Sequence, residues 1–164
     1  MTGSLLQINV SPGGIPKRPI PSGVLTPLGL EGDSHAHPAI HGGPRKAILL
    51  IASEAIDELI ARGYPLFYGA LGENFTTRGI DVRQLRLGQI LRVGVTSIEI
   101  TQCRGPCSTL DVYGPLLQRE IYDARVKAGD PASPRWGMSG FYASVVEPGP
   151  VFPGDAIEIV STLA

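Results

Sequence analysis

Both cysteines of this chain lie in one short stretch, TQCRGPCSTLD, which spans residues 101–111. Cys103 and Cys107 could form a disulfide, bind a metal ion together, or consist of one reactive thiolate and one inert thiol. A closed zinc site needs four ligands, and iron–sulfur clusters are generally held by four cysteines. The sequence offers no second cysteine pair, and a chain without an export signal is expected to keep its thiols reduced. We therefore predict a site with a single thiolate.

Cys107 is the better candidate for that thiolate. It follows Gly105 and Pro106 at the exit of a predicted strand, on a segment expected to be a loop, and the nearby Arg104 favours the charged form of the thiol. Cys103, at the strand end, is expected to be a small buried hydrophobic residue. Burial is also the default for a free cysteine, so these residues alone leave an inert Cys107 open as the alternative.

All three histidines lie in one short segment, and together with Asp33 they are competent zinc or iron ligands: His35, His37 and His41. Their spacing differs from the H-x-H-x-D-H cluster of metallohydrolases, because Asp33 precedes the histidines and Pro38 follows His37. A hydrolase built on a hard metal ion is therefore one hypothesis. The favoured alternative is that His35 and His37 are solvated loop residues.

His41 is followed by two glycines and then by two basic residues. The backbone N–H groups of Gly42 and Gly43 could bind an anion, and Arg45 and Lys46 add positive charge. An oxyanion or phosphate pocket is one interpretation of this segment. The other is a glycine turn that enters a strand, with both basic side chains in solvent, and the residues do not decide between the two.

A third candidate is Asn74, in the turn Gly72-Glu73-Asn74 before a short β-prone segment. Its amide contains both a donor and an acceptor, as recognition of a planar heterocycle requires. The alternative is a turn asparagine that only hydrogen-bonds the local backbone.

Short strands must position these candidate residues. Glycine and proline, 21 and 15 in number, interrupt the apolar runs, and this punctuation is typical of many short strands joined by turns. We expect strands over residues 5–10, 23–30, 46–51, 89–93, 96–101, 139–146 and 155–160, and helices over residues 53–63 and 115–127. The similar stretches 87–93 and 153–159 should be strands of one sheet. Mainly β structure with α excursions predicts a closed or nearly closed β-barrel, because closure removes exposed sheet edges.

Length and charge limit the class of protein. The 164 residues, 43% of them hydrophobic, predict a single domain over residues 1–164. The formal net charge of -1 gives no electrostatic basis for binding duplex nucleic acid or an anionic membrane. The longest apolar run, residues 47–52, is far shorter than the roughly 20 residues that span a bilayer. We therefore expect a soluble, cytoplasmic protein.

Several segments in a fixed order carry a resemblance to a known family: GLEGDSHAHPAIHGGPRKAILL, LGENFTTRGI, LRLGQILRVG, ITQCRGPCSTLD and GFYASVVEPGPVFPGDAIEIV. Together they resemble the MOSC family, whose domain is also found at the C-terminus of molybdenum-cofactor sulfurases. The match runs from about residue 29 to residue 160. The resemblance implies a β-barrel of the pyruvate-kinase-barrel type. It also implies handling of the molybdenum cofactor (molybdopterin), as a sulfur carrier or as a reductase of N-hydroxylated compounds.

The resemblance also assigns roles to individual residues. The family's invariant cysteine corresponds to Cys107, which would either ligate molybdenum or carry a persulfide. The other candidates would contact the cofactor, mostly at its anionic end: His41, Gly42, Gly43, Arg45, Asn74 and Arg104. We expect a stand-alone MOSC protein, without the preceding pyridoxal-phosphate domain or the following ferredoxin-like domain of larger family members. We therefore expect a separate reductase or sulfur-donor protein as partner, and a small molecule as substrate.

Overall fold

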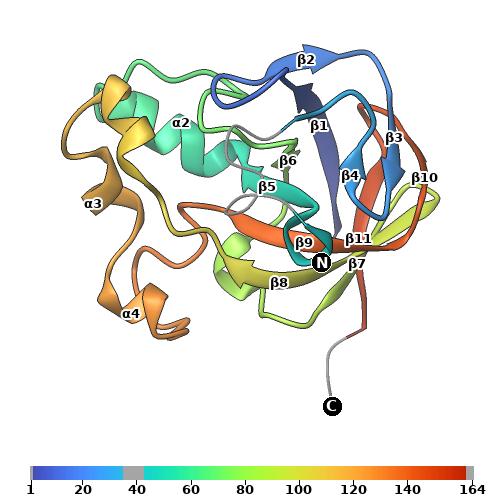
Figure 1. Cartoon of the computed structure of the whole chain (residues 1–164). Helices are drawn as coiled ribbons and strands as arrows, with labels where there is room; N and C mark the ends of the chain where they lie inside the picture. Colours follow the sequence, from blue (N-terminus) through green and yellow to red (C-terminus); the bar gives the residue numbers. More distant parts are fainter. Residues whose placement is uncertain (1, 35–42, 162–164) are drawn as a thin grey trace.

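The computed structural model describes residues 2–34 and 43–161, and strands are its main elements (Figure 1). The strands are β1 (Thr2–Val10), β2 (Arg18–Ile20), β3 (Gly23–Thr26), β4 (Gly29–Leu30), β5 (Ile48–Ala52), β6 (Phe75–Arg78), β7 (Ile90–Val93), β8 (Thr96–Cys103), β9 (Phe141–Glu147), β10 (Gly149–Val151) and β11 (Ala156–Ser161). The α-helices and short 3-10 helices of the described residues are α2 (Ser53–Ala61), α3 (Leu117–Ile121), α4 (Ala124–Lys127), η1 (Pro44–Lys46), η2 (Val82–Gln84) and η3 (Ser108–Tyr113). None of the helices described is long and apolar enough to cross a membrane.

A closed barrel forms the centre of the structure. Its strands follow the order β11-β7-β8-β9-β5-β6-β1, and β1 pairs with β11 to complete the ring. Strand β2 pairs with β1 beside the ring, and β10, β3 and β4 form a separate three-stranded sheet. Each strand of the ring has a partner on both sides, so the ring is closed without an exposed edge among the described strands. The prediction of a β-barrel is confirmed.

Strand β5 and helix α2 show why the apolar runs fold as they do. All five residues of β5 are buried, as expected for a strand whose two faces are both covered. Helix α2 follows directly and buries Ala55, Ile56 and Leu59. It ends two residues before the predicted end, and Gly63 follows with a φ of 100°. Strands β5 and β6 are parallel, because the segment between them, which contains α2, returns the chain to the same end of the sheet.

The helix predicted over residues 115–127 is instead two short helices, α3 and α4, so this prediction was wrong. Tyr122 is extended between them, with φ −153° and ψ 143°. Asp123 then begins α4, since its Oδ1 accepts a hydrogen bond of 2.8 Å from the backbone N–H of Val126. An aspartate that caps a new helix competes with continuation of the preceding one.

The two similar stretches of sequence contribute adjacent strands. Strand β7 pairs with β11 in antiparallel orientation, with Val93 opposite Ile157. A glycine with positive φ precedes each strand, Gly88 at 89° and Gly154 at 95°. Their expected position in one sheet is therefore confirmed.

Helices α2, α3 and α4 lie on one side of the barrel, and the small sheet β10-β3-β4 lies on the other (Figure 1). The chain leaves β8 beside the start of β9, since Cys103 is the register partner of Phe141. Trp136 fixes the later return to β9. Its ring packs edge-on against Phe141 with centroids 5.8 Å apart, and its Nε1 donates a hydrogen bond of 2.9 Å to the Leu85 carbonyl. Cys107 lies in the segment between the end of β8 and Trp136.

Candidate functional site

Cys107 lies on a loop that begins where the pairing of β8 with β9 ends. The backbone N–H of Arg104 donates a last hydrogen bond of 2.9 Å to the Gly140 carbonyl. Gly105 and Pro106 then carry the chain away from the sheet, and Cys107 is the N-cap residue of η3. Its thiol is half-buried, and its Sγ lies 2.9 Å from Thr109 Oγ1. The sulfur that the sequence singled out is thus in a loop and partly accessible.

Cys103 occupies a different environment. It is the last residue of β8 and packs against the hydrophobic core. Burial raises the pKa of its thiol to about 11, so this thiol stays protonated at neutral pH. A protonated thiol is a poor nucleophile and a poor metal ligand. The assignment of the functional thiol to Cys107 remains a prediction, and the raised pKa of the half-buried Cys103 thiol supports it.

Arg104 is buried beneath the loop, not exposed beside it. Only 7% of the residue is accessible. Its Nη2 donates a hydrogen bond of 2.7 Å to the Leu71 carbonyl, and its Nη1 donates a longer one of 3.4 Å to the Ser139 carbonyl. Burial lowers the pKa of Arg104, while the negative charges of Tyr142, Glu73 and Cys107 act in the opposite direction. The guanidinium therefore supplies buried positive charge close to the Cys107 thiol.

The segment before β5 contains the described part of the predicted anion site. It forms η1, and the Arg45 carbonyl accepts a hydrogen bond of 2.5 Å from Thr101 Oγ1 of β8. The Lys46 ammonium lies 5.2 Å from the centre of the Tyr142 ring of β9, within reach of a cation–π attraction. The Arg45 side chain is exposed, and Gly43 has a φ of 96°. Two cationic residues thus lie against β8 and β9, the strands that flank the Cys107 loop.

The histidines and one of the glycines predicted for the site lie outside the described residues: His35, His37, His41 and Gly42. Their roles remain predictions. Among the residues that the structure describes, no group of three or more histidine, cysteine, aspartate or glutamate side chains is arranged to hold a metal ion.

Asp33, the fourth ligand considered for a hard metal ion, is engaged in a buried ion pair. Its Oδ1 lies 2.6 Å from the Lys17 ammonium, and the two side chains are 4% and 6% exposed. The same oxygen accepts a hydrogen bond from the Ser11 backbone N–H, and Oδ2 accepts one of 2.9 Å from Asn74 Nδ2. Both carboxylate oxygens are therefore used within the protein, which makes Asp33 a structural residue in this conformation.

The Asn74 amide is also used within the protein. Its Oδ1 accepts a hydrogen bond of 3.0 Å from the Leu49 backbone N–H of β5. Its Nδ2 donates to the Asn9 carbonyl of β1 and to Asp33. These contacts join two strands of the barrel to the segment that leads into the histidines. A contact between Asn74 and a planar heterocycle remains a prediction.

Glu73, beside Asn74, is fully buried, and nothing in its local sequence predicts this. Its Oε2 accepts hydrogen bonds of 2.9 Å from the Gly69 backbone N–H and 3.1 Å from Thr76 Oγ1. Its Oε1 has no partner among the described residues. Burial raises the pKa of this carboxyl to about 7, although its hydrogen bonds and the charge of Arg104 act in the opposite direction. Glu73 thus changes charge near neutral pH beneath the candidate site.

We expect Glu73 to make stability depend on pH. In the unfolded chain the carboxyl loses its proton near pH 4.5, whereas the folded protein retains it up to about pH 7. Between these values the folded state holds the extra proton, so rising pH favours unfolding. The expected loss in the free energy of unfolding is on the order of 3 kcal/mol. In Glu73→Gln, the free energy of unfolding measured with urea should not fall between pH 4.5 and pH 7. If the variant shows the same dependence on pH as wild type, the folded protein does not hold this proton on Glu73.

Sequence reasoning missed three aromatic or acidic residues around the thiol: Glu73, Tyr113 and Tyr142. Glutamates in turns and tyrosines in strands are often exposed to solvent, so the local sequence does not indicate that Glu73 and Tyr142 are buried. The nearest signal was position, since Glu73 lies in the turn that contains Asn74, and Tyr113 ends the 3-10 helix that begins after Cys107.

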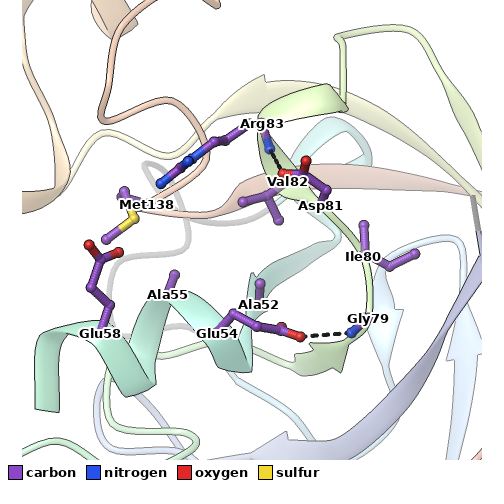
Figure 2. A pocket seen from close by; sticks show the side chains of 10 residues that line it. All are labelled: Ala52, Glu54, Ala55, Glu58, Gly79, Ile80, Asp81, Val82, Arg83 and Met138. Atoms are coloured by element: carbon purple, nitrogen blue, oxygen red, sulfur yellow. Dashed lines mark hydrogen bonds between the residues drawn. The ribbon is translucent and has the colours of Figure 1, made fainter. Parts of the chain in front are cut away.

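A separate hollow of about 330 Å³ lies between α2 and residues 79–83. Figure 2 shows Glu58 and Arg83 reaching toward Met138 at one end of it. At the other end, Glu54 Oε2 accepts a hydrogen bond of 2.9 Å from the Gly79 backbone N–H. None of the residues predicted for the site lines this hollow, which is therefore distinct from the surroundings of Cys107.

Comparison with known sequences identifies relatives of this chain. The model of the MOSC domain family matches residues 37–158. The chain is 33% identical over 152 residues to YflK of Bacillus subtilis (strain 168), which covers 90% of this chain and 63% of that protein. It is 32% identical over 146 residues to YiiM of Escherichia coli (strain K12), which covers 86% of this chain and 60% of that protein. The chain thus spans about three fifths of the length of these relatives.

Solved structures give the same result for the fold. YiiM from Geobacillus stearothermophilus superposes with a TM-score of 0.71 at 27% identity, over 97% of this chain and 75% of that one. YiiM from Escherichia coli superposes with a TM-score of 0.70 at 25% identity, over 99% of this chain and 71% of that one. The YUAD protein of Bacillus subtilis superposes with a TM-score of 0.73 over 99% of this chain and 98% of that one. Its sequence identity is 19%, so this likeness concerns the fold alone.

Proposed function

This chain belongs to the MOSC domain family, and from that membership we propose that it binds the molybdenum cofactor and reduces small N-hydroxylated compounds. Hydroxylaminopurine-like bases and hydroxamates are the candidate substrates. The electrons come from a separate flavin or iron–sulfur protein, because two cysteines cannot hold a cluster as well as the cofactor. We expect this reaction to take place in the cytoplasm, with no nucleic acid or membrane as partner.

The single observation that carries the proposal is the difference between the two thiols. Both thiols are half-buried, but Cys107 lies on a loop at the start of η3, whereas Cys103 ends β8 against the core, where desolvation keeps it protonated. A soft thiolate suits a soft metal, and it must be accessible to act as an anchoring ligand. Arg45 is exposed on the neighbouring segment η1, where a cation can compensate a phosphate. These residues fit a group that combines a metal centre with an anionic end.

The proposal gives each candidate site residue a role. Cys107 would hold the metal, and Gly43 and Arg45, with His41 and Gly42, would hold the anionic end. Asn74 and Arg104 would contact the cofactor from the protein interior, since both are buried. When bound, the cofactor supplies an oxygen acceptor that can be re-reduced in one-electron steps. Each turnover consumes two electrons and two protons, breaks the N–O bond of the substrate, and releases water together with the amine, or with the amide where the substrate is a hydroxamate.

The test uses cofactor-loaded protein, reduced viologen as electron donor, and a panel of N-hydroxylated substrates. We expect turnover with the viologen and none with NADH alone, because the proposed reaction takes its electrons from a separate reductase protein. Molybdenum-loaded protein that reduces none of the substrates, while Cys107 is isolated as a persulfide, would exclude the reductase.

Sulfur transfer is the second candidate function, and the same observation favours it. A persulfide carrier also needs an accessible thiolate, and Cys107 lies half-buried on the loop that leads into η3. A hard-metal hydrolase has less support, because both oxygens of Asp33 are engaged with other groups of the protein. Elemental analysis separates molybdenum from the zinc of a hydrolase, and persulfide mapping separates the sulfur carrier from the reductase.

A further inference from the structure

Two side chains at opposite ends of the Cys107 loop are bound to adjacent carbonyls of one distant turn. Arg104, before the cysteine, donates a hydrogen bond of 2.7 Å to the Leu71 carbonyl. Tyr113, the last residue of η3, donates one of 2.8 Å from its hydroxyl to the Ala70 carbonyl. The loop is therefore attached to the same support on both sides of Cys107.

The turn that provides these carbonyls is itself held in place. The backbone N–H of Gly69 is bound by the buried carboxyl of Glu73, and the Gly69 carbonyl accepts hydrogen bonds from the backbone N–H groups of Lys17 and Gly72. Gly69 has a φ of 101°, and a Cβ atom there would lie 2.2 Å from the Lys17 carbonyl oxygen. Only glycine fits this close approach, so the turn packs as one fixed unit against the chain before β2.

Between its two attachments the loop has little freedom. The Leu110 side chain is fully buried, and its backbone N–H donates a hydrogen bond of 3.1 Å to the Cys107 carbonyl. Thr109 Oγ1 lies 2.9 Å from the Cys107 sulfur. The direction of the sulfur therefore follows the position of η3, and η3 is fixed at its end by Tyr113.

We propose that Tyr113 is a positioning residue for Cys107: its hydroxyl, together with Arg104, fixes the Cys107 loop on the Ala70 and Leu71 carbonyls. The effect on turnover rests on the proposed function, whereas the effect on the thiol does not. A thiol that must meet a metal centre or a sulfur acceptor benefits from a fixed direction, because small displacements of a reacting group lower rates strongly.

The test variant is Tyr113→Phe, which keeps the ring and removes only the hydroxyl. In protein without cofactor, iodoacetamide should alkylate Cys107 about threefold faster, within the range for loss of one hydrogen bond, because the loop then opens more often. Cys103 serves as an internal reference whose rate should not change. In loaded protein, kcat should fall about tenfold while KM for the N-hydroxylated substrate stays within about twofold, since the thiol orients the reaction and does not bind the substrate.

Tyr64→Phe is the matched control. Its ring packs near Gly114, directly after η3, and among the described residues its hydroxyl makes no hydrogen bond. It should behave as wild type in both measurements. Wild-type rates for Tyr113→Phe in both measurements would overturn the positioning role. A faster alkylation of Cys107 in Tyr113→Phe, combined with no turnover by the loaded wild type, would support the positioning role and reject the proposed reductase.

Discussion

Replacing Cys107 with serine should lower viologen-driven reduction of N-hydroxylated substrates by more than about 100-fold, whereas Cys103→Ser should retain most of the activity. Loss of outer-shell partners of a metal ligand already costs 10- to 100-fold in affinity or activity, and loss of the ligand itself should cost more. Serine keeps the size of the side chain, but its hydroxyl is neither soft nor ionised at neutral pH. Bound molybdenum, measured by elemental analysis, should fall together with the rate.

The Cys103→Ser variant is the control because both substitutions exchange sulfur for oxygen within the same stretch of chain. Cys103 is packed against the core and its thiol is protonated at neutral pH, so serine there changes packing and not a reactive group. If Cys103→Ser abolished turnover and Cys107→Ser preserved it, the site assignment would be reversed. Retained molybdenum with lost turnover in Cys107→Ser would mean that the thiol serves the reaction without anchoring the metal.

The sequence predicted most of the barrel because its strands are defined locally. Alternation along β8 and β11, and a continuous apolar run in β5, each reflect which faces of a strand are covered. The strands predicted over residues 89–93 and 96–101 correspond to β7 and β8, which pair in antiparallel orientation. The single helix predicted over residues 115–127 failed because Asp123 offers its own side chain to the Val126 backbone N–H. Helical spacing of apolar residues does not reveal such a cap when it falls inside the run.

The candidate site was only partly predictable because its supporting contacts are distant in sequence. Gly105 and Pro106 were sufficient to place Cys107 on a loop, since they act on their own backbone. The environment of Asn74 depends on Asp33, 41 residues away, and on Asn9, 65 residues away. A motif can indicate that an asparagine matters. Only the closed barrel determines whether its amide faces a ligand or another strand.

The buried ion pair between Lys17 and Asp33 leads to the second large expected effect. Asp33→Asn should lower the free energy of unfolding by about 3–5 kcal/mol, because it leaves the Lys17 ammonium buried without an opposite charge. Urea unfolding followed by the fluorescence of Trp136, the single tryptophan of the chain, measures this loss. Glu58→Gln is the control: its 2.7 Å pair with Arg62 is 41% and 45% exposed, and breaking it should cost less than about 1 kcal/mol.

The same variant separates a structural Asp33 from a metal-binding one. A structural role requires that the double variant Lys17→Met, Asp33→Asn recover a large part of the lost stability, because the unpaired charge is then gone. A metal-ligand role requires instead that Asp33→Asn lose bound metal while its stability without metal stays near that of wild type. An Asp33→Asn protein as stable as the Glu58→Gln control would therefore contradict the structural role. It would restore Asp33 to the histidine segment as a potential ligand, and with it the hydrolase hypothesis.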